Sequence, residues 1–315
     1  MSASIRRITC AALGALALAA VLPVLADAPA ASGSTPAVAA QPPAGSLITA
    51  VRSPAWLVHA EVTAPIIPGM LVGNGDTLRT AAGGRVYLDL PEHSRVKLGE
   101  NTEFVTPSMV MAHDQQGSMF KGVLHILKGV FRFTTSLVGK SEHREVSIQV
   151  GTATIGVRGT DVWGRAGIDG SLVALLEGHI SMDMPGHPGM SMDQPMHYMM
   201  MPNGGAMQMN VPVTQANVAD WAAQTDVAPG SGVLTGDGRW ILALISSTSV
   251  ADTTRLMKRL AEAGYPAEDT VVMVQGKSWH RLVIRQAASY QDAKVLGDRI
   301  GKLFPLMSPW VFRQK

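Results

Sequence analysis

The sequence predicts two folded modules: an all-β sandwich or roll over residues 47–223 and a small α+β module of element order βαββαβ over residues 237–315. The β prediction rests on apolar side chains that alternate with polar ones between short glycine-containing turns. The α+β prediction rests on a duplicated pattern of strand, Ser-x-x-Asp and amphipathic helix. Residues 27–46 and 224–236 are rich in Gly, Pro, Ala or Ser and are predicted to be linkers.

Residues 1–26 have the three parts of a secretory signal peptide. Arg6 and Arg7 precede an apolar run over 8–22, and Val-Leu-Ala at 24–26 supplies a cleavage point. The run is short for a membrane span of about 20 residues, so we expect cleavage after Ala26 and no transmembrane anchor afterwards. The only cysteine, Cys10, lies in this segment, which excludes disulfides and cysteine-based zinc sites from the exported chain.

The predicted β module shows period-two alternation in several segments. Val86, Leu88 and Leu90 fall on one side of a strand, as do Phe131 and Phe133 of another. Turns such as GNGD and AAGG interrupt at short intervals, and no long helical pattern appears. About 150 residues are enough to bury a core of their own.

The order of short sequence motifs in this module resembles that of the FecR domain. The matching segments are GDTLRT (75–80), RVYLDLPEHSRVKLGENT (85–102), KGVFRF (128–133), VGTATIGVRGTDVW (150–163) and VALLEGHISM (173–182). The best-known FecR proteins pass a signal across the inner membrane through a transmembrane helix to a sigma factor. This sequence has neither that helix nor a cytoplasmic part, so the resemblance implies only a periplasmic β module that contacts a partner, an envelope protein or the wall.

The Arg158-Gly159-Thr160 block is adjacent to Asp161, which suggests catalysis at first sight. Adjacent residues of a strand point to opposite faces and do not converge on one substrate without a bulge. We therefore expect a structural role, with Arg158 paired to a carboxylate such as Glu177.

The C-terminal module contains the pattern strand, loop, Ser-x-x-Asp, helix twice. Ser249 and Ser289 are predicted helix caps, and Asp252 and Asp292 are predicted to reach back to the cap backbone. Strands are expected after each helix, over 270–275 and 309–315. Apolar residues fall on one face of each helix, so both helices are expected to cover one side of a sheet and to leave the other side open.

This module resembles the SPOR domain, which binds glycan strands of peptidoglycan. Trp279, Arg281, Leu282 and Ile284 are in register with its third strand, whereas the first strand matches only at Ser246, with Ala243 where the family has Gln. The resemblance places Trp279 and Arg281 on the open face as a sugar-stacking surface and a donor. The predicted glycan-binding residues are Ser246, Trp279, Arg281, Trp310 and Val311.

The βαββαβ order, which is ferredoxin-like or RNP-like, also belongs to RNA-recognition domains. RNA recognition needs aromatic residues at alternate positions of the third strand, and HRLVIR (280–285) has none, so no nucleic acid is expected. The sequence contains no complete phosphate-binding loop, nucleophile elbow or His-Glu-x-x-His motif, so we predict that the protein is not an enzyme.

Residues 182–209 hold ten of the eighteen methionines and follow from neither resemblance. Thioether and imidazole groups select Cu(I), which makes Met190, Met192, Met196 and His197 candidate copper ligands. The alternative is a hairpin insertion, with turns at HPG (187–189) and PNGG (202–205), whose methionines fill gaps along the sheet.

The sequence thus predicts an exported, non-enzymatic protein of a Gram-negative envelope, located in the periplasm. Its C-terminal module would bind peptidoglycan and its β module an unknown partner. The alternative function is periplasmic copper binding by the methionine-rich segment.

Overall fold

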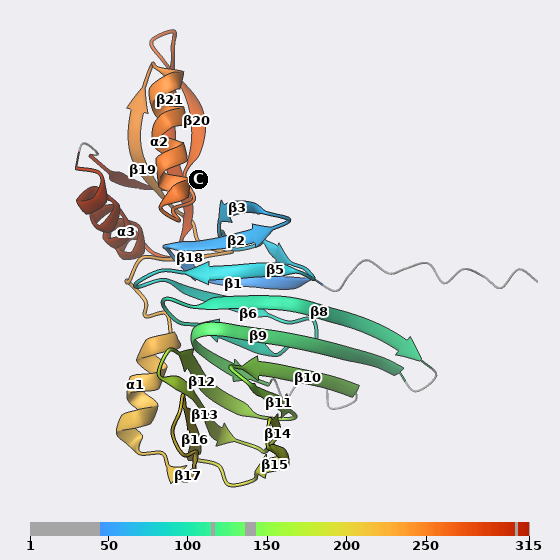
Figure 1. Ribbon diagram of the computed structural model, residues 1–315. Helices are drawn as coiled ribbons and strands as arrows, with labels where there is room; N and C mark the ends of the chain where they lie inside the picture. The colour runs from blue at the N-terminus through green and yellow to red at the C-terminus, as the bar shows by residue number, and fades with distance from the viewer. Residues whose placement is uncertain (1–44, 115–116, 136–142, 306–307, 315) are drawn as a thin grey trace, which may run out of the picture. The chain divides into compact units, whose positions relative to one another are not determined.

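The computed structural model describes residues 45–114, 117–135, 143–305 and 308–314, which form one compact unit (Figure 1). The predicted signal peptide, with Cys10, and the predicted linker up to residue 44 lie outside the described residues. Among the described residues, no helix has both the length and the apolar character needed to cross a membrane.

Two sheets make up the β module. The order in the first sheet is β3 (Val62–Pro65), β2 (Ala55–His59), β5 (Asp76–Thr80), β8 (Glu103–Asp114), β9 (Gly117–Thr134), β10 (His143–Val150), β11 (Ala153–Val157), β14 (Ile180–Met184) and β15 (His187–Met192). All neighbours are antiparallel except β9 and β10, which run parallel.

The second sheet contains the C-terminal third of β9, from Gly129 to Thr134. Its order is β4 (Leu71–Val72), β1 (Ser46–Arg52), β6 (Arg85–Asp89), β7 (Arg95–Leu98), β9, β12 (Asp161–Gly167), β13 (Gly170–Glu177), β16 (His197–Pro202) and β17 (Gln208–Pro212). The strand β9 therefore passes from one sheet to the other.

The core of the β module contains the apolar residues that the alternation predicts. Val86, Leu88, Phe131 and Phe133 are each at most 1% exposed. They belong to one cluster with side chains of the first sheet, such as Phe104. The all-β prediction is confirmed for this module.

The structure explains two glycines of the FecR-like phrases. Gly129 has φ +98° at the point where β9 changes sheets, and a Cβ there would lie 2.3 Å from the Thr102 Cα. Gly178 has φ +85°, and a Cβ there would lie 2.2 Å from the Gly159 carbonyl oxygen. Both positions combine a left-handed backbone with close backbone approach, which glycine alone accommodates.

A helix that the sequence analysis did not predict follows the β module: α1 (Gln215–Thr225). Thr214 caps it, because its hydroxyl accepts the backbone N–H of Asn217 while the Asn217 side chain accepts the Thr214 N–H. Trp221 of α1 stacks on Trp163 of β12, with ring centroids 4.6 Å apart and planes 9° from parallel. This helix covers part of the second sheet.

The C-terminal module has the predicted order βαββαβ. Its elements are β19 (Trp240–Ser247), α2 (Val250–Glu262), β20 (Glu268–Val274), β21 (Lys277–Ala287), α3 (Tyr290–Leu303) and β22 (Trp310–Arg313). The strands form an antiparallel sheet in the order β20, β21, β19, β22. Both helices contact this sheet, and Leu260, Leu296 and Ile300 fill the core beneath them. Leu303, at the end of α3, is 55% exposed.

The caps of α2 and α3 are the predicted serines, but the two aspartates differ. The hydroxyls of Ser249 and Ser289 accept the backbone N–H three residues on. Asp252 is exposed and contacts Arg255 on its own helix. Asp292 is 2% exposed, and its Oδ1 accepts the N–H groups of Gly232 and Val233, each at 3.0 Å.

Those two N–H groups lie in the predicted linker 224–236, which the structure shows to contain a strand, β18 (Val233–Thr235). This strand pairs with β1 on one side and with Ala287 of β21 on the other. Arg299 of α3 donates to the carbonyl oxygens of Ser53 and Ser231, both at 2.8 Å. The segment is therefore part of the fold, and its backbone hydrogen bonds are satisfied by both modules.

Candidate functional site

The face of the C-terminal sheet opposite α2 and α3 carries four of the five predicted glycan-binding residues. Strand register pairs Ser246 with Arg281, while Trp279 lies two residues before Arg281 on the same side of β21. Trp310 pairs with Ala243, whose other neighbour is Val283 of β21. The residues come from three adjacent strands, β19, β21 and β22.

A bulge in β19 brings Ser246 onto this face. The pairing of β19 with β21 shifts between Ala243 and Ile245, so that Leu244 and Ile245 both contribute to the core beneath the helices. Without the extra residue, Ala243 and Ser246 would point to opposite sides of the sheet. The bulge thus re-aims a polar side chain toward Arg281.

Arg281 is held at the centre of this face. Its Nε donates to the Ser246 hydroxyl at 3.1 Å, and its guanidinium carbon lies 5.3 Å from the centroid of the Trp310 ring. The contact with Trp310 is a cation–π geometry, and one hydrogen bond leaves guanidinium donors for a ligand. Trp310 is 39% exposed, so part of its ring faces solvent.

Small and apolar residues form the floor of this face. Ala243 and Val283 are 0% and 2% exposed and pack with Ile241 and Phe312. Ala243 stands where the SPOR pattern has a Gln, so the centre of the face offers no amide from this position. The polar chemistry here is carried by Arg281 and Ser246.

Val311, the fifth predicted glycan-binding residue, does not lie on this face. It pairs with Leu242 and packs against the core under the helices, on the opposite side of β22 from Trp310. Neighbouring residues of a strand face opposite ways, so only one of the two lies on the face that carries Arg281. The structure assigns that position to Trp310.

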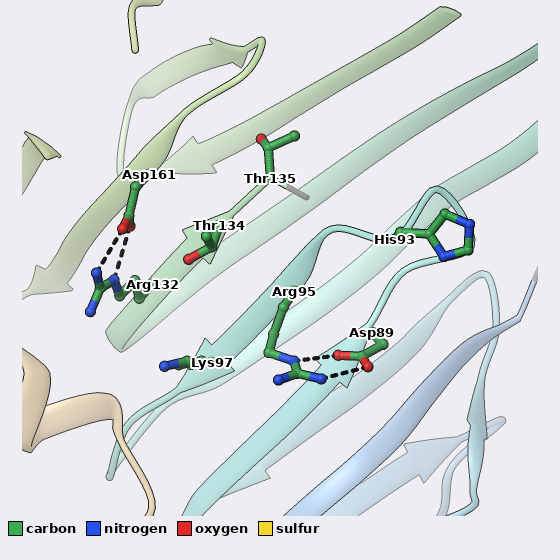
Figure 2. A pocket seen from close by; sticks show the side chains of 8 residues that line it. All are labelled: Asp89, His93, Arg95, Lys97, Arg132, Thr134, Thr135 and Asp161. Atoms are coloured by element: carbon green, nitrogen blue, oxygen red, sulfur yellow. Dashed lines mark hydrogen bonds and ion pairs between the residues drawn. The ribbon is translucent and has the colours of Figure 1, made fainter. Parts of the chain in front are cut away.

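A second candidate site is a pocket of about 440 Å³ on the outer face of the β module (Figure 2). Asp89 accepts both Nε and a terminal nitrogen of Arg95, at 2.6 and 2.8 Å. Asp161 accepts Arg132 in the same bidentate way, at 2.9 and 2.6 Å. The remaining lining residues are His93, Lys97, Thr134 and Thr135.

The ion pairs set the electrostatics of this pocket. The hydrogen bonds that Arg95 and Arg132 donate to Asp89 and Asp161 raise the pKa of both guanidinium groups, which therefore stay charged. Lys97 is paired with Asp226 at 2.6 Å. With each of the three cations matched by an aspartate, the pocket is polar but nearly neutral, which suits a partner surface that carries both signs.

The pocket was not predicted from the sequence, although a signal for it was present. Asp89, Arg95, Lys97 and Arg132 are the polar positions that alternate with the core residues of β6, β7 and β9. Alternation placed them on the outer face but could not show that three strands bring them together. The predicted pairing of Arg158 with Glu177 is not found, and it is Asp161 that forms the ion pair, with Arg132 of the KGVFRF segment.

The three methionines among the four predicted copper ligands are divided between two hydrophobic clusters. Met192 is 2% exposed in the main core of the β module, and Met190 packs against the same core. Met196 packs with Trp163 and Trp221, and the His197 Nδ1 lies 3.0 Å from the Pro195 carbonyl oxygen. Among the described residues, no group of three or more His, Cys, Asp or Glu residues is placed to hold a metal ion.

The methionine-rich segment instead forms two hairpins in different sheets, β14–β15 and β16–β17. Met182, Met192 and Met199 are buried at 2% exposure or less, which is the filler role considered as the alternative. The predicted HPG turn is wrong. His187, Pro188 and Gly189 are the first residues of β15, and the turn is formed by the two residues before them, Pro185 and Gly186.

Comparison with known families bears on the β module. Residues 76–181 match the family model described as FecR protein. This part of the β module is therefore FecR-like. The match includes all four residues of the two ion pairs in the pocket and ends before α1, so it does not extend to the C-terminal module.

Two crystal structures of a candidate anti-sigma factor from Parabacteroides distasonis ATCC 8503 are similar to the chain. One is 14% identical, with a TM-score of 0.39, and the alignment covers 76% of this chain and 99% of that one. The other is 11% identical, with a TM-score of 0.37, and the alignment covers 64% and 96%. No curated protein matches the chain.

Proposed function

We propose that this protein is an exported, non-enzymatic component of the cell envelope that binds peptidoglycan glycan strands through the open face of its C-terminal sheet. The observation that carries the proposal is Arg281, which Ser246 and Trp310 hold in place beside Trp279. A flat indole offers apolar surface to a sugar ring, and a fixed guanidinium offers planar donors to hydroxyl, amide or carboxylate groups.

The β module supplies the second half of the proposal. Its FecR-like part presents the paired charges of the pocket in Figure 2, and we assign to this surface an envelope protein as partner. Because the surface has both signs in fixed geometry, such a partner is selected by charge arrangement more than by net charge. The location that fits both halves is the periplasm.

Binding to isolated sacculi tests the glycan proposal. Trp279→Ala and Arg281→Ala are each expected to weaken co-sedimentation of the purified protein by about 1–3 kcal/mol, since central aromatic and arginine contacts carry most of a small interface. The matched control is Arg255→Ala, which removes an exposed arginine on α2, on the other side of the sheet.

The outcome is decisive because circular dichroism reports the fold separately. If the double variant keeps its spectrum and still sediments with sacculi as the wild type does, the open face is not the binding site. Loss of binding in the Arg255→Ala control would show instead that general positive charge, not the face, holds the protein to the wall.

A further inference from the structure

The edge strands of this protein differ in how well they are protected against pairing with another chain. An edge strand exposes unpaired N–H and C=O groups and pairs with other chains unless proline, charge, a bulge or short length prevents it. Among the edge strands of the described residues, β3, β15 and β17 contain prolines 65, 188 and 212, β4 has two residues, and β22 has four and directly follows Pro309.

The strand β20 lacks proline, a bulge and short length, and its charged residues are confined to its first two positions, Glu268 and Asp269. It pairs only with β21 in the described part of the chain, over seven residues without a register shift. Its sequence from 270 to 274 is Thr-Val-Val-Met-Val, with no charge and no proline. Val271, Met273 and Val274 are 57%, 65% and 46% exposed, three large apolar side chains within four residues.

The strand is also complementary to itself. In an antiparallel pair of two copies centred on Val272, each Val271 lies opposite the Met273 of the other copy, so the most exposed apolar side chains cover one another. The acidic start of the strand, Glu268 and Asp269, then lies beside the turn of the other copy, near Lys277. A parallel pair would instead set like charges side by side.

We propose that two copies of this chain associate through β20, in antiparallel register about a two-fold axis at Val272. The axis is perpendicular to the sheet, because antiparallel pairing of identical edges keeps the same face upward in both copies. The C-terminal sheets join into one, and the two Arg281 faces lie on the same side. That last consequence gives two-point attachment to a glycan and rests on the proposed function, whereas the association itself does not.

Sedimentation velocity over a concentration series tests the association in the purified protein without any glycan. The variant Val271→Lys/Met273→Lys changes only exposed side chains and places lysines opposite lysines at the axis. We expect the dimer dissociation constant to rise tenfold or more, since like charges directly opposite one another disfavour strand pairing. The control Val62→Lys alters an equally exposed valine on the proline-containing edge β3 and is expected to have no effect.

A single cysteine at the axis gives a second measurement. The exported chain has no cysteine of its own if cleavage follows Ala26, so Val272→Cys is expected to form a disulfide-linked dimer under mild oxidation, and Val62→Cys is not. The proposal is overturned if the wild type remains monomeric throughout the series. It is equally overturned if the lysine variant dimerises like the wild type, or if a peptide or the chain's own residues 27–44 occupy the edge instead.

Discussion

Replacing Asp292 by alanine is expected to destabilise the protein far more than the same change at Asp252, although both residues occupy the same position of a repeated motif. Asp292 is buried and accepts three hydrogen bonds: from the Gly232 and Val233 backbones at 3.0 Å and from the Ser289 hydroxyl at 2.6 Å. Asp252 is exposed, and its carboxylate contacts Arg255.

The magnitude follows from what the substitution leaves behind. A hydrogen bond to a charged group contributes about 1.5–3 kcal/mol, and a buried donor without a partner costs about 1–3 kcal/mol. Asp292→Ala leaves two backbone N–H groups without their acceptor where β18 joins the modules, so we expect a loss of roughly 3–5 kcal/mol. Asp252→Ala removes a solvent-exposed pair and a favourable helix charge, for a loss of about 0.5–1 kcal/mol.

Chemical denaturation followed by tryptophan fluorescence measures both variants, with the wild type as reference. Asp292→Asn retains an acceptor oxygen and is expected to lie between Asp292→Ala and the wild type. Equal destabilisation by Asp292→Ala and Asp252→Ala would refute the reasoning, since it would mean that the carboxylate does not hold β18.

Two further predictions concern the FecR-like part of the β module. Gly178→Ala is expected to cost roughly 2–4 kcal/mol in the free energy of unfolding, because its Cβ would meet the Gly159 carbonyl, whereas Gly186→Ala at a similar φ meets nothing within 4 Å and is expected to cost about 1 kcal/mol. A double-mutant cycle on Arg132 and Asp161, measured by urea denaturation, is expected to give a coupling of about 1–2 kcal/mol, since both side chains are largely buried and bonded in bidentate geometry.

A surface pair provides the control for that cycle. Arg79 is half-exposed and contacts Glu103, and its coupling is expected to be about 0.5 kcal/mol or less. Equal coupling energies for the two pairs would contradict the reasoning that burial and bidentate geometry strengthen the pair of Arg132 and Asp161. Likewise, similar losses at Gly178 and Gly186 would mean that the close backbone approach at Gly178 relaxes freely.

The sequence determined much of this fold because it contains two regular patterns, the alternation of strands and the repeated helix-capping motif. Alternation identified the strands that supply Val86, Leu88, Phe131 and Phe133 to the core, and the repeated Ser-x-x-Asp pattern located both C-terminal helices. The FecR-like segments predicted this region because each is short enough to be recognised on its own, although the contacts that require glycine join residues far apart in the sequence, such as Gly178 and Gly159.

Local patterns were insufficient where a segment draws its structure from distant partners. The sequence of segment 224–236 predicts a linker because it contains only three large apolar residues among Gly and Pro, yet β1 and β21 supply the hydrogen bonds that make part of it a strand. The helix α1 is short and weakly amphipathic, so its stability depends on the stacking of Trp221 on Trp163. The methionines of 182–209 were ambiguous for the same reason, since a thioether serves equally as ligand or filler.

The candidate sites, like the fold, were determined partly by the sequence pattern and partly by the tertiary structure. The sequence itself placed Trp279 and Arg281 on one face, because a strand has a period of two. Only the tertiary structure decided that a bulge turns Ser246 to Arg281, that Trp310 and not Val311 lies beside it, and that Asp292 is buried. Register, bulges and burial depend on which strands meet, and that information is distributed over the whole chain instead of being contained in any one segment.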